Sequence, residues 1–222
     1  MMITKHRIIA IDGPAGSGKS TVARRLAGRI GSRYIDTGAM YRAATVKIIR
    51  AGIAPENETA VVDAIQGTRI SLQDNSVHID GEDVTGEIRS LKISKALSTI
   101  SSYRGVREFM KKAQRMMADS DDIVMEGRDI GSAVFPDADF KFYLDASPEI
   151  RARRRYSEII QKGQTNLEYN DVLSEVRERD RLDMRREHSP LVKPDDAVVV
   201  RTDDMSIDDV VETLAECITN RI

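Results

Sequence analysis

The stretch RIIAIDGPAGSGKST at residues 7–21 decides the fold. Its apolar run at residues 7–12 predicts a strand that is buried on both faces, as in a parallel sheet. Residues 13–20 match the phosphate-loop pattern GxxxxGK(S/T) and stand between this strand and a helix. Because the match is complete and has the required context, it indicates a phosphate-binding loop rather than a chance glycine-rich turn. These residues therefore predict an α/β nucleotide-binding fold.

The loop residues supply the contacts that a nucleoside triphosphate needs. Glycines let the backbone direct N–H groups toward phosphate oxygens, and the following helix N-terminus adds a favourable dipole. We expect Lys19 to neutralise the β and γ phosphates of ATP, and the Ser20 hydroxyl to hold Mg²⁺. The predicted nucleotide-binding residues are Gly13, Pro14, Ala15, Gly16, Ser17, Gly18, Lys19, Ser20 and Thr21.

The alternation of strand and helix continues along the chain. In the first helix, Val22, Leu26 and Ile30 recur every four residues, and Gly31 is expected to end it. Ser147 and Ser206 are expected to cap two later helices. Further strands are predicted at residues 34–36, 123–125, 140–144 and 197–200.

Two stretches interrupt this alternation. Apolar and polar residues alternate over residues 68–84, with turn signals at 74–76 and 80–81, which predicts a small antiparallel sheet. Residues 149–193 are highly charged, and we expect them to be helical with a break at 162–166. Both stretches are predicted to be additions to the α/β core.

Composition limits the classes of function. The 222 residues carry a formal net charge of −2, so long nucleic acid is not an expected partner. Neither a membrane span of roughly 20 apolar residues nor a signal peptide is expected. The single cysteine, Cys217, rules out an internal disulfide and favours a reducing cytoplasm, and the three scattered histidines do not support a zinc site.

The sequence DTGAMYR at residues 36–42 directly follows the second predicted strand. Ligands bind at the carboxyl ends of parallel strands, so this loop is a candidate acceptor site. Arg42 can bind phosphate through two hydrogen bonds, and Tyr41 offers a ring for stacking. The alternative is an ordinary helix start, with Thr37 as the N-cap and Tyr41 in the core. The residues alone leave both interpretations open.

The sequence EGRD at residues 126–129 follows the third clear strand. Glu126 stands at a Walker B-like position that helps to hold Mg²⁺, and Arg128 and Asp129 could reach an acceptor. The alternative is a turn with a surface ion pair.

A third candidate cluster lies near the end of the charged stretch. Arg179, Asp183 and Arg186 are spaced by four and three residues, which places them on one helical face. A solvated face with ion pairs is the alternative for these three residues.

Together these motifs resemble the bacterial cytidylate kinases along nearly the whole chain. The matching segments are residues 11–21, 36–42, 81–89, 106–107, 127–131, 134–138, 144–147 and 178–180, with Asp183, Pro190 and Leu191. The resemblance implies a five-stranded parallel sheet flanked by helices, an acceptor-binding domain with an antiparallel insert, and a helical lid. The implied domains are a core at 1–36, 106–148 and 194–222, an acceptor domain at 37–105, and a lid with its following helix at 149–193.

The resemblance also implies an activity and its residues. Family members transfer phosphate from ATP to CMP or dCMP with Mg²⁺, accept UMP poorly and are often monomers. The implied acceptor contacts are Thr37, Tyr41, Arg42, Ser98, Arg107, Arg128, Asp129, Arg179, Asp183 and Arg186. The implied catalytic residues are Lys19, Arg128 and one lid arginine, taken as Arg155 from Arg151, Arg153, Arg154 and Arg155. Relatives often have Asp where this chain has Glu126.

Two competing hypotheses follow from the phosphate loop. The chain could be a kinase for another acceptor, such as UMP, AMP or shikimate, or a nucleotide-binding regulatory module without kinase activity. The intact Lys19, Ser20 and Arg128 argue against the second hypothesis.

Overall fold

The structure, a computed structural model, describes residues 6–73, 76–161 and 168–220. The described chain forms two units. The first contains residues 6–34, 121–161, 168–186 and 190–220, and the second contains residues 35–73, 76–120 and 187–189. Residues 74–75 of one predicted turn, and the helix break predicted at 162–166, lie outside the described residues.

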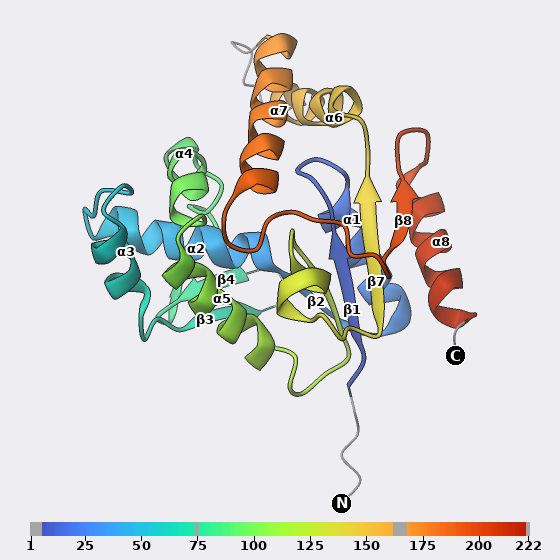
Figure 1. The fold of residues 1–222 in the computed structure, drawn as a ribbon, viewed down its shortest axis with the longest axis horizontal. Coiled ribbons are helices and arrows are strands. Elements are labelled where there is room, and N and C mark those ends of the chain that lie inside the picture. The colour runs from blue at the N-terminus through green and yellow to red at the C-terminus, as the bar shows by residue number, and fades with distance from the viewer. Residues whose placement is uncertain (1–5, 74–75, 162–167, 221–222) are drawn as a thin grey trace, which may run out of the picture. The chain divides into compact units, whose positions relative to one another are not determined.

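A five-stranded parallel sheet organises the first unit (Figure 1). Its order is β2-β6-β1-β7-β8, so the strand before the phosphate loop is central. Ile9 of β1 is in register with Val124 of β6 and Phe140 of β7. Central position explains the unbroken apolar run, because both faces of β1 are covered. The strands are β1 Ile8–Asp12, β2 Arg33–Asp36, β6 Ile123–Glu126, β7 Phe140–Asp145 and β8 Val198–Arg201.

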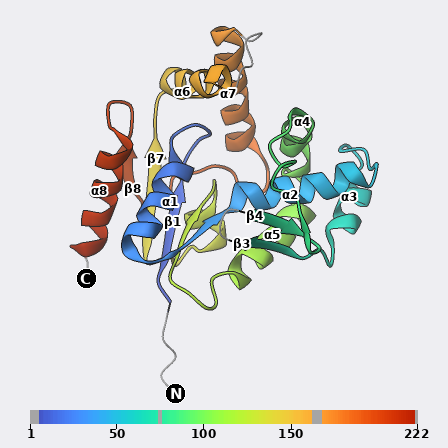
Figure 2. The ribbon, with the colours of Figure 1, turned by 180° about the vertical axis from the view of Figure 1, so that it is seen from behind.

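Helices α1 (Lys19–Ile30) and α8 (Ile207–Thr219) pack on one face of this sheet (Figure 2). Leu26 of α1, Phe142 of β7 and Leu214 of α8 belong to one buried apolar cluster. Gly31 ends α1 in the left-handed conformation, as predicted. Ser206 and Asp209 form a capping box at the start of α8, which confirms that prediction too.

Helices α6 (Pro148–Gln161) and α7 (Tyr169–Arg185) lie side by side beyond the carboxyl end of β7 (Figure 1). Ala152, Val172 and Val176 form a small apolar core between them. The prediction that helix continues to residue 193 is wrong, because α7 ends at Arg185 and Arg186 has extended backbone. Ser189 at φ 47° and Pro190 then prevent a helical continuation.

The second unit combines helices with the predicted antiparallel sheet. Ile70 pairs with Ile79, which confirms the insert at residues 68–84, and Asp80 and Gly81 turn the chain with positive φ. The sequence pattern did not predict the three helices that follow α2. The elements are α2 Thr37–Arg50, α3 Glu58–Ile65, β3 Ile70–Gln73, β4 Ser76–Ile79, β5 Glu82–Asp83, α4 Leu91–Ile100 and α5 Arg104–Met116. Across the residues that the structure describes, no helix has the length and apolar character to cross a membrane.

Candidate active site

The phosphate loop joins β1 to α1 in a backbone shape that only glycine permits. Gly13 has φ 147°, and a Cβ there would stand 2.1 Å from the Leu144 carbonyl oxygen. Gly16 and Gly18 also have positive φ, at 80° and 92°. Gly18 occupies the N-cap of α1, so no side-chain oxygen caps this end within the described chain. An uncapped helix start directs its first N–H groups toward an anion.

Lys19 is held inside the loop. Its side chain is 4% exposed, and Nζ donates to the Pro14 carbonyl oxygen at 2.6 Å and to Ser17 Oγ at 3.3 Å. Burial, then the nearby charge of Arg128, lowers the pKa of Lys19, while Glu126 and Asp12 oppose this shift. A phosphate anion at the loop would favour the charged form of Lys19.

Ser20 and Glu126 bring a hydroxyl and a carboxylate together beside the loop. Ser20 Oγ donates to Glu126 Oε1 at 2.5 Å, and the Tyr34 hydroxyl donates to the same oxygen at 3.1 Å. Magnesium takes hard oxygen ligands and commonly uses one or two protein groups besides water and phosphate. The pair therefore fits Mg²⁺ as part of a nucleotide complex. Within the described residues, no group of three His, Cys, Asp or Glu side chains could hold a metal by itself.

Asp12 ties the end of β1 to the segment after Asp129. Its carboxylate accepts hydrogen bonds from the backbone N–H groups of Ile130 at 2.9 Å and Gly131 at 2.7 Å. These residues open a short π-helix, η1 Ile130–Val134. Burial raises the pKa of Asp12 to about 6, against the lowering effect of the two N–H groups. Sequence reasoning missed this role, although an acid that ends a buried apolar strand was a usable signal.

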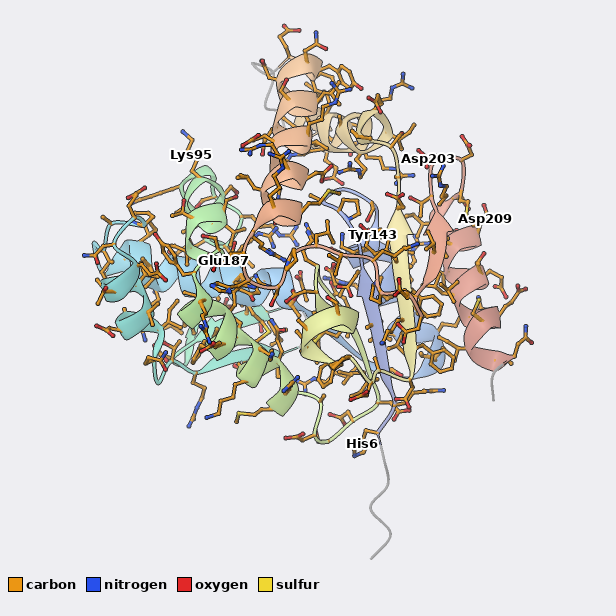
Figure 3. The ribbon with its side chains drawn as sticks, in the orientation of Figure 1. His6, Lys95, Tyr143, Glu187, Asp203 and Asp209 are labelled. Atoms are coloured by element: carbon orange, nitrogen blue, oxygen red, sulfur yellow. The ribbon has the colours of Figure 1, made fainter. Side chains whose placement is uncertain are left out.

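Tyr143 lies at the same end of the sheet, on β7 opposite Asp12 (Figure 3). Burial, followed by the charges of Asp145 and Asp12, raises the pKa of the Tyr143 phenol to about 12. The phenol therefore stays protonated under physiological conditions.

Arg128 and Asp183 form the ion pair that links the loop after β6 to α7. Arg128 Nε donates to Asp183 Oδ2 at 3.2 Å, and Arg186 Nη1 donates to Asp183 Oδ1 at 3.4 Å. Burial raises the pKa of Asp183, but Arg128, Arg186 and Arg179 outweigh it, so the net pKa is lowered. The structure thus brings these predicted residues together, with Arg186 one position beyond the helix.

The four predicted lid arginines have different environments. Arg151 is buried and bonds to the phosphate loop, and Arg154 donates to the side chain and carbonyl of Thr202. Arg155 pairs with Glu175 of α7 at 2.9 Å, and Arg153 is exposed. The catalytic role of Arg155 stays a prediction.

Further contacts hold the phosphate loop and the neighbouring chain in place. Thr202 Oγ1 donates to the Ser17 carbonyl oxygen at 3.3 Å. Asp203, between β8 and α8, accepts a hydrogen bond from the Ser147 N–H at 2.8 Å (Figure 3). Sequence reasoning missed both, since their partners lie far away in the chain.

In the second unit, the start of α2 carries predicted acceptor residues. Asp36, and not Thr37, is the N-cap, because the Asp36 carboxylate accepts from the Ala39 N–H at 2.8 Å. The alternative with Thr37 as cap is therefore wrong, and Thr37 is the buried first residue of the helix. A Cβ on Gly38 would stand 3.0 Å from Arg42 Nη1, so the guanidinium lies close over this glycine.

Tyr41 and Arg107 also meet in the second unit. The Arg107 guanidinium carbon lies 5.5 Å from the centre of the Tyr41 ring, which is cation–π geometry. Arg107 is buried and donates to the Ser101 carbonyl oxygen at 3.1 Å. Ser98 is exposed on α4. Tyr41 and Arg107 thus share a local cluster, and the role of Ser98 stays a prediction.

A phosphate loop after the central strand of a parallel sheet, with a buried lysine and a serine–glutamate pair beside it, defines a P-loop phosphotransferase. The family model described as Cytidylate kinase matches residues 9–220. This chain belongs to the cytidylate kinase family, as the sequence resemblance predicted.

Individual relatives agree with this family. The chain is 50% identical over 210 residues to the cytidylate kinase of Caldanaerobacter subterraneus subsp. tengcongensis, covering 95% of this chain and 93% of the relative. It is 43% identical over 205 residues to the cytidylate kinase of Clostridioides difficile, covering 92% and 94%.

Solved structures with low sequence identity share the fold. A shikimate kinase from Bacteroides thetaiotaomicron gives a TM-score of 0.50 at 11% identity, covering 96% of this chain and 98% of the other. An uncharacterized protein from Eubacterium ventriosum gives a TM-score of 0.53 at 11% identity, covering 96% and 99%. The predicted α/β fold is thereby confirmed.

Proposed function

We propose that this protein is a kinase that transfers the γ-phosphoryl group of ATP to CMP or dCMP, giving ADP and CDP or dCDP. The observation that carries the proposal is family membership over residues 9–220. The buried Lys19 and the Ser20–Glu126 pair supply the machinery that phosphoryl transfer requires.

The donor binds at the phosphate loop. Backbone N–H groups of the loop and of the α1 start contact the phosphates of ATP, and Lys19 neutralises charge on the β and γ groups. Lys19 then exchanges its bond to the Pro14 carbonyl for a bond to phosphate. Ser20 and Glu126 would hold Mg²⁺, which would supply positive charge that neutralises the phosphates during transfer.

The acceptor binds through the residues that the sequence resemblance implies. Arg42 and Arg107 bind the phosphate of CMP, and Thr37 and Tyr41 position the nucleotide. Arg128, Asp129 and Ser98 contact the cytosine, while Arg179, Asp183 and Arg186 contact the ribose side. Support comes from the contacts within each unit, Tyr41 with Arg107 and Asp183 with Arg128 and Arg186.

Transfer is direct and in line, without a covalent enzyme intermediate. Lys19, Arg128 and the lid residue Arg155 stabilise charge on the transferring group. Residues 149–193 act as the lid that excludes water and suppresses ATP hydrolysis. We also propose that the protein works as a monomer in the cytoplasm, with its single cysteine reduced.

An acceptor panel tests the proposal. CMP, dCMP, UMP, AMP and shikimate are each offered with ATP and Mg²⁺, and ADP release is followed by a coupled assay. The expected kcat/KM is highest for CMP and dCMP and much lower for UMP. A reaction without acceptor measures background ATP hydrolysis and serves as the control. ADP release that is fastest with AMP or shikimate, or that no acceptor stimulates, would reject the proposal.

A further inference from the structure

Arg151 connects three separate segments through one buried guanidinium. Nε donates to the Ala146 carbonyl oxygen at 2.8 Å, and Nη1 donates to the Ala15 carbonyl oxygen of the phosphate loop at 3.0 Å. Nη1 and Nη2 also donate to the two carboxylate oxygens of Asp180 on α7, at 3.0 and 2.5 Å. Arg151 is 2% exposed and Asp180 is 9% exposed, so both charges are removed from water.

The contact with Ala15 fixes the backbone of the phosphate loop. A trans peptide is planar, so its N–H points opposite to its C=O. With the Ala15 carbonyl directed at Arg151, the N–H of Gly16 points away from it. A Cβ on Gly16 would stand 3.2 Å from Arg151 Cβ, so the loop backbone packs directly on this side chain. Arg151 therefore sets the direction of a loop N–H that an anion would use.

The contact with Asp180 connects the phosphate loop, through Arg151, to helix α7. Asp180 and Asp183 are three residues apart, so they are neighbours on the helix surface. Asp183 is the carboxylate that accepts from Arg128 and Arg186. One side chain thus joins the phosphate loop to the helix that carries the Arg128 partner.

We propose that Arg151 and Asp180 are a positioning pair that couples occupation of the phosphate loop by ATP to the acceptor-contacting end of α7. The proposal rests on the function proposed above and adds the link between its two binding events. A buried ion pair contributes little net stability but strongly resists separation, because either charge alone would remain buried and uncompensated. Loop and helix are therefore expected to move together. By reciprocity, ATP and CMP then raise each other's affinity by the same factor.

A second ion pair between α6 and α7 provides the control. Arg177 Nη2 lies 2.6 Å from Glu149 Oε1 and joins the same two helices. Its side chains are 59% and 46% exposed. Exposed pairs of this kind contribute little. Arg177→Lys therefore controls for a change of arginine to lysine at the α6–α7 interface.

Calorimetric titration tests the coupling. The Kd values of a non-hydrolysable ATP analogue with Mg²⁺ and of CMP are measured alone and in the presence of the other, for wild type, Arg151→Lys, Asp180→Asn and Arg177→Lys. In the wild type we expect each ligand to tighten the other about fivefold or more. A lysine cannot reproduce the paired hydrogen bonds from the guanidinium to Asp180. Arg151→Lys should therefore raise the Kd of the ATP analogue about tenfold, and the ratio of each ligand's Kd without and with the other ligand should fall to near one. Asp180→Asn should also remove the coupling, and Arg177→Lys should match the wild type.

These readouts separate positioning from a merely structural role. A structural role would lower the melting temperature and the active fraction but leave the Kd values and their coupling unchanged. Unchanged coupling in Arg151→Lys and Asp180→Asn, or no coupling in the wild type, would overturn the proposal.

Hydrogen exchange on the wild type tests the coupling between the phosphate loop and α7 even if both variants fail to fold. The ATP analogue alone should protect backbone amides of residues 176–184, and unchanged exchange there would also overturn the proposal. If the wild type releases no ADP with ATP and CMP, the proposed function fails, while this exchange experiment still tests the link between loop and helix.

Discussion

The buried carboxylate of Asp12 makes the free energy of unfolding depend on pH. The carboxylate is buried at the end of β1 and accepts two backbone hydrogen bonds from η1. Burial raises its pKa from 3.8 to about 6, even though the Ile130 and Gly131 N–H groups and Lys19 lower it. The native state thus binds a proton to Asp12 more tightly than the unfolded chain does.

The sign and size of the effect follow from linkage. Between about pH 4 and about pH 6 the native state binds more protons at Asp12 than the unfolded state, so its contribution to the free energy of unfolding falls as pH rises. A shift of roughly two pKa units corresponds to about 3 kcal/mol. This contribution is fully lost above about pH 7, where Asp12 is ionised in both states.

Urea unfolding of the ligand-free protein measures this effect against a variant that cannot titrate. Asp12→Asn keeps the size of the side chain, and the difference between the unfolding free energies of wild type and variant isolates Asp12. That difference should fall by about 3 kcal/mol from about pH 3 to about pH 7. In a Lys19→Met background the fall should move to higher pH, because Lys19 lowers the Asp12 pKa. A difference that stays constant or grows with pH would refute the reasoning.

Three further predictions concern catalysis, base choice and a helix cap. Lys19→Ala should reduce kcat at least about a hundredfold in a protein with unchanged circular dichroism, because it removes charge stabilisation from the phosphoryl group; near-wild-type turnover would contradict this. Asp129→Ala should narrow the CMP-to-UMP ratio of kcat/KM by about ten- to a hundredfold, since one hydrogen bond to a charged group is lost; an unchanged ratio would remove Asp129 from base recognition. Ser206→Ala should lower the free energy of unfolding by about 1 kcal/mol through loss of the capping box, with no change in KM; equal urea midpoints would count against it.

The sequence predicted those features whose physical cause is local. The central strand has apolar residues on both faces, and the phosphate loop needs glycine where φ is positive, so both leave a direct pattern in the chain. Gly31 and Ser206 end and begin helices through contacts within a few residues. The antiparallel insert was predictable because alternation and turn residues coincide in a short stretch.

Features set by tertiary contacts could not be predicted in the same way. Arg151 is one of four closely spaced arginines, and only the fold shows that it is the buried one beneath the phosphate loop. Asp180 lies in the family-matching segment 178–180, but nothing in the sequence identifies its partner Arg151 on α6. Asp36 and not Thr37 is the N-cap because β2 ends and α2 begins between these two residues. The residue types alone do not determine this boundary. The early end of α7 was partly predictable from Pro190.

The charges around the phosphate loop explain why its structure favours an anion. Burial is the largest cause of the lowered pKa of Lys19, and the nearby positive charge of Arg128 lowers it further. The carboxylates of Glu126, Asp12 and Asp183 only partly offset it. A phosphate bound near Lys19 and Arg128 would attract both cations and so offset the repulsion between them. In this buried region of low dielectric, these electrostatic contacts are stronger than in water. Binding energy is therefore concentrated where charge develops during transfer, and Lys19 would exchange its hydrogen bonds to the Pro14 carbonyl and to Ser17 Oγ for bonds to phosphate.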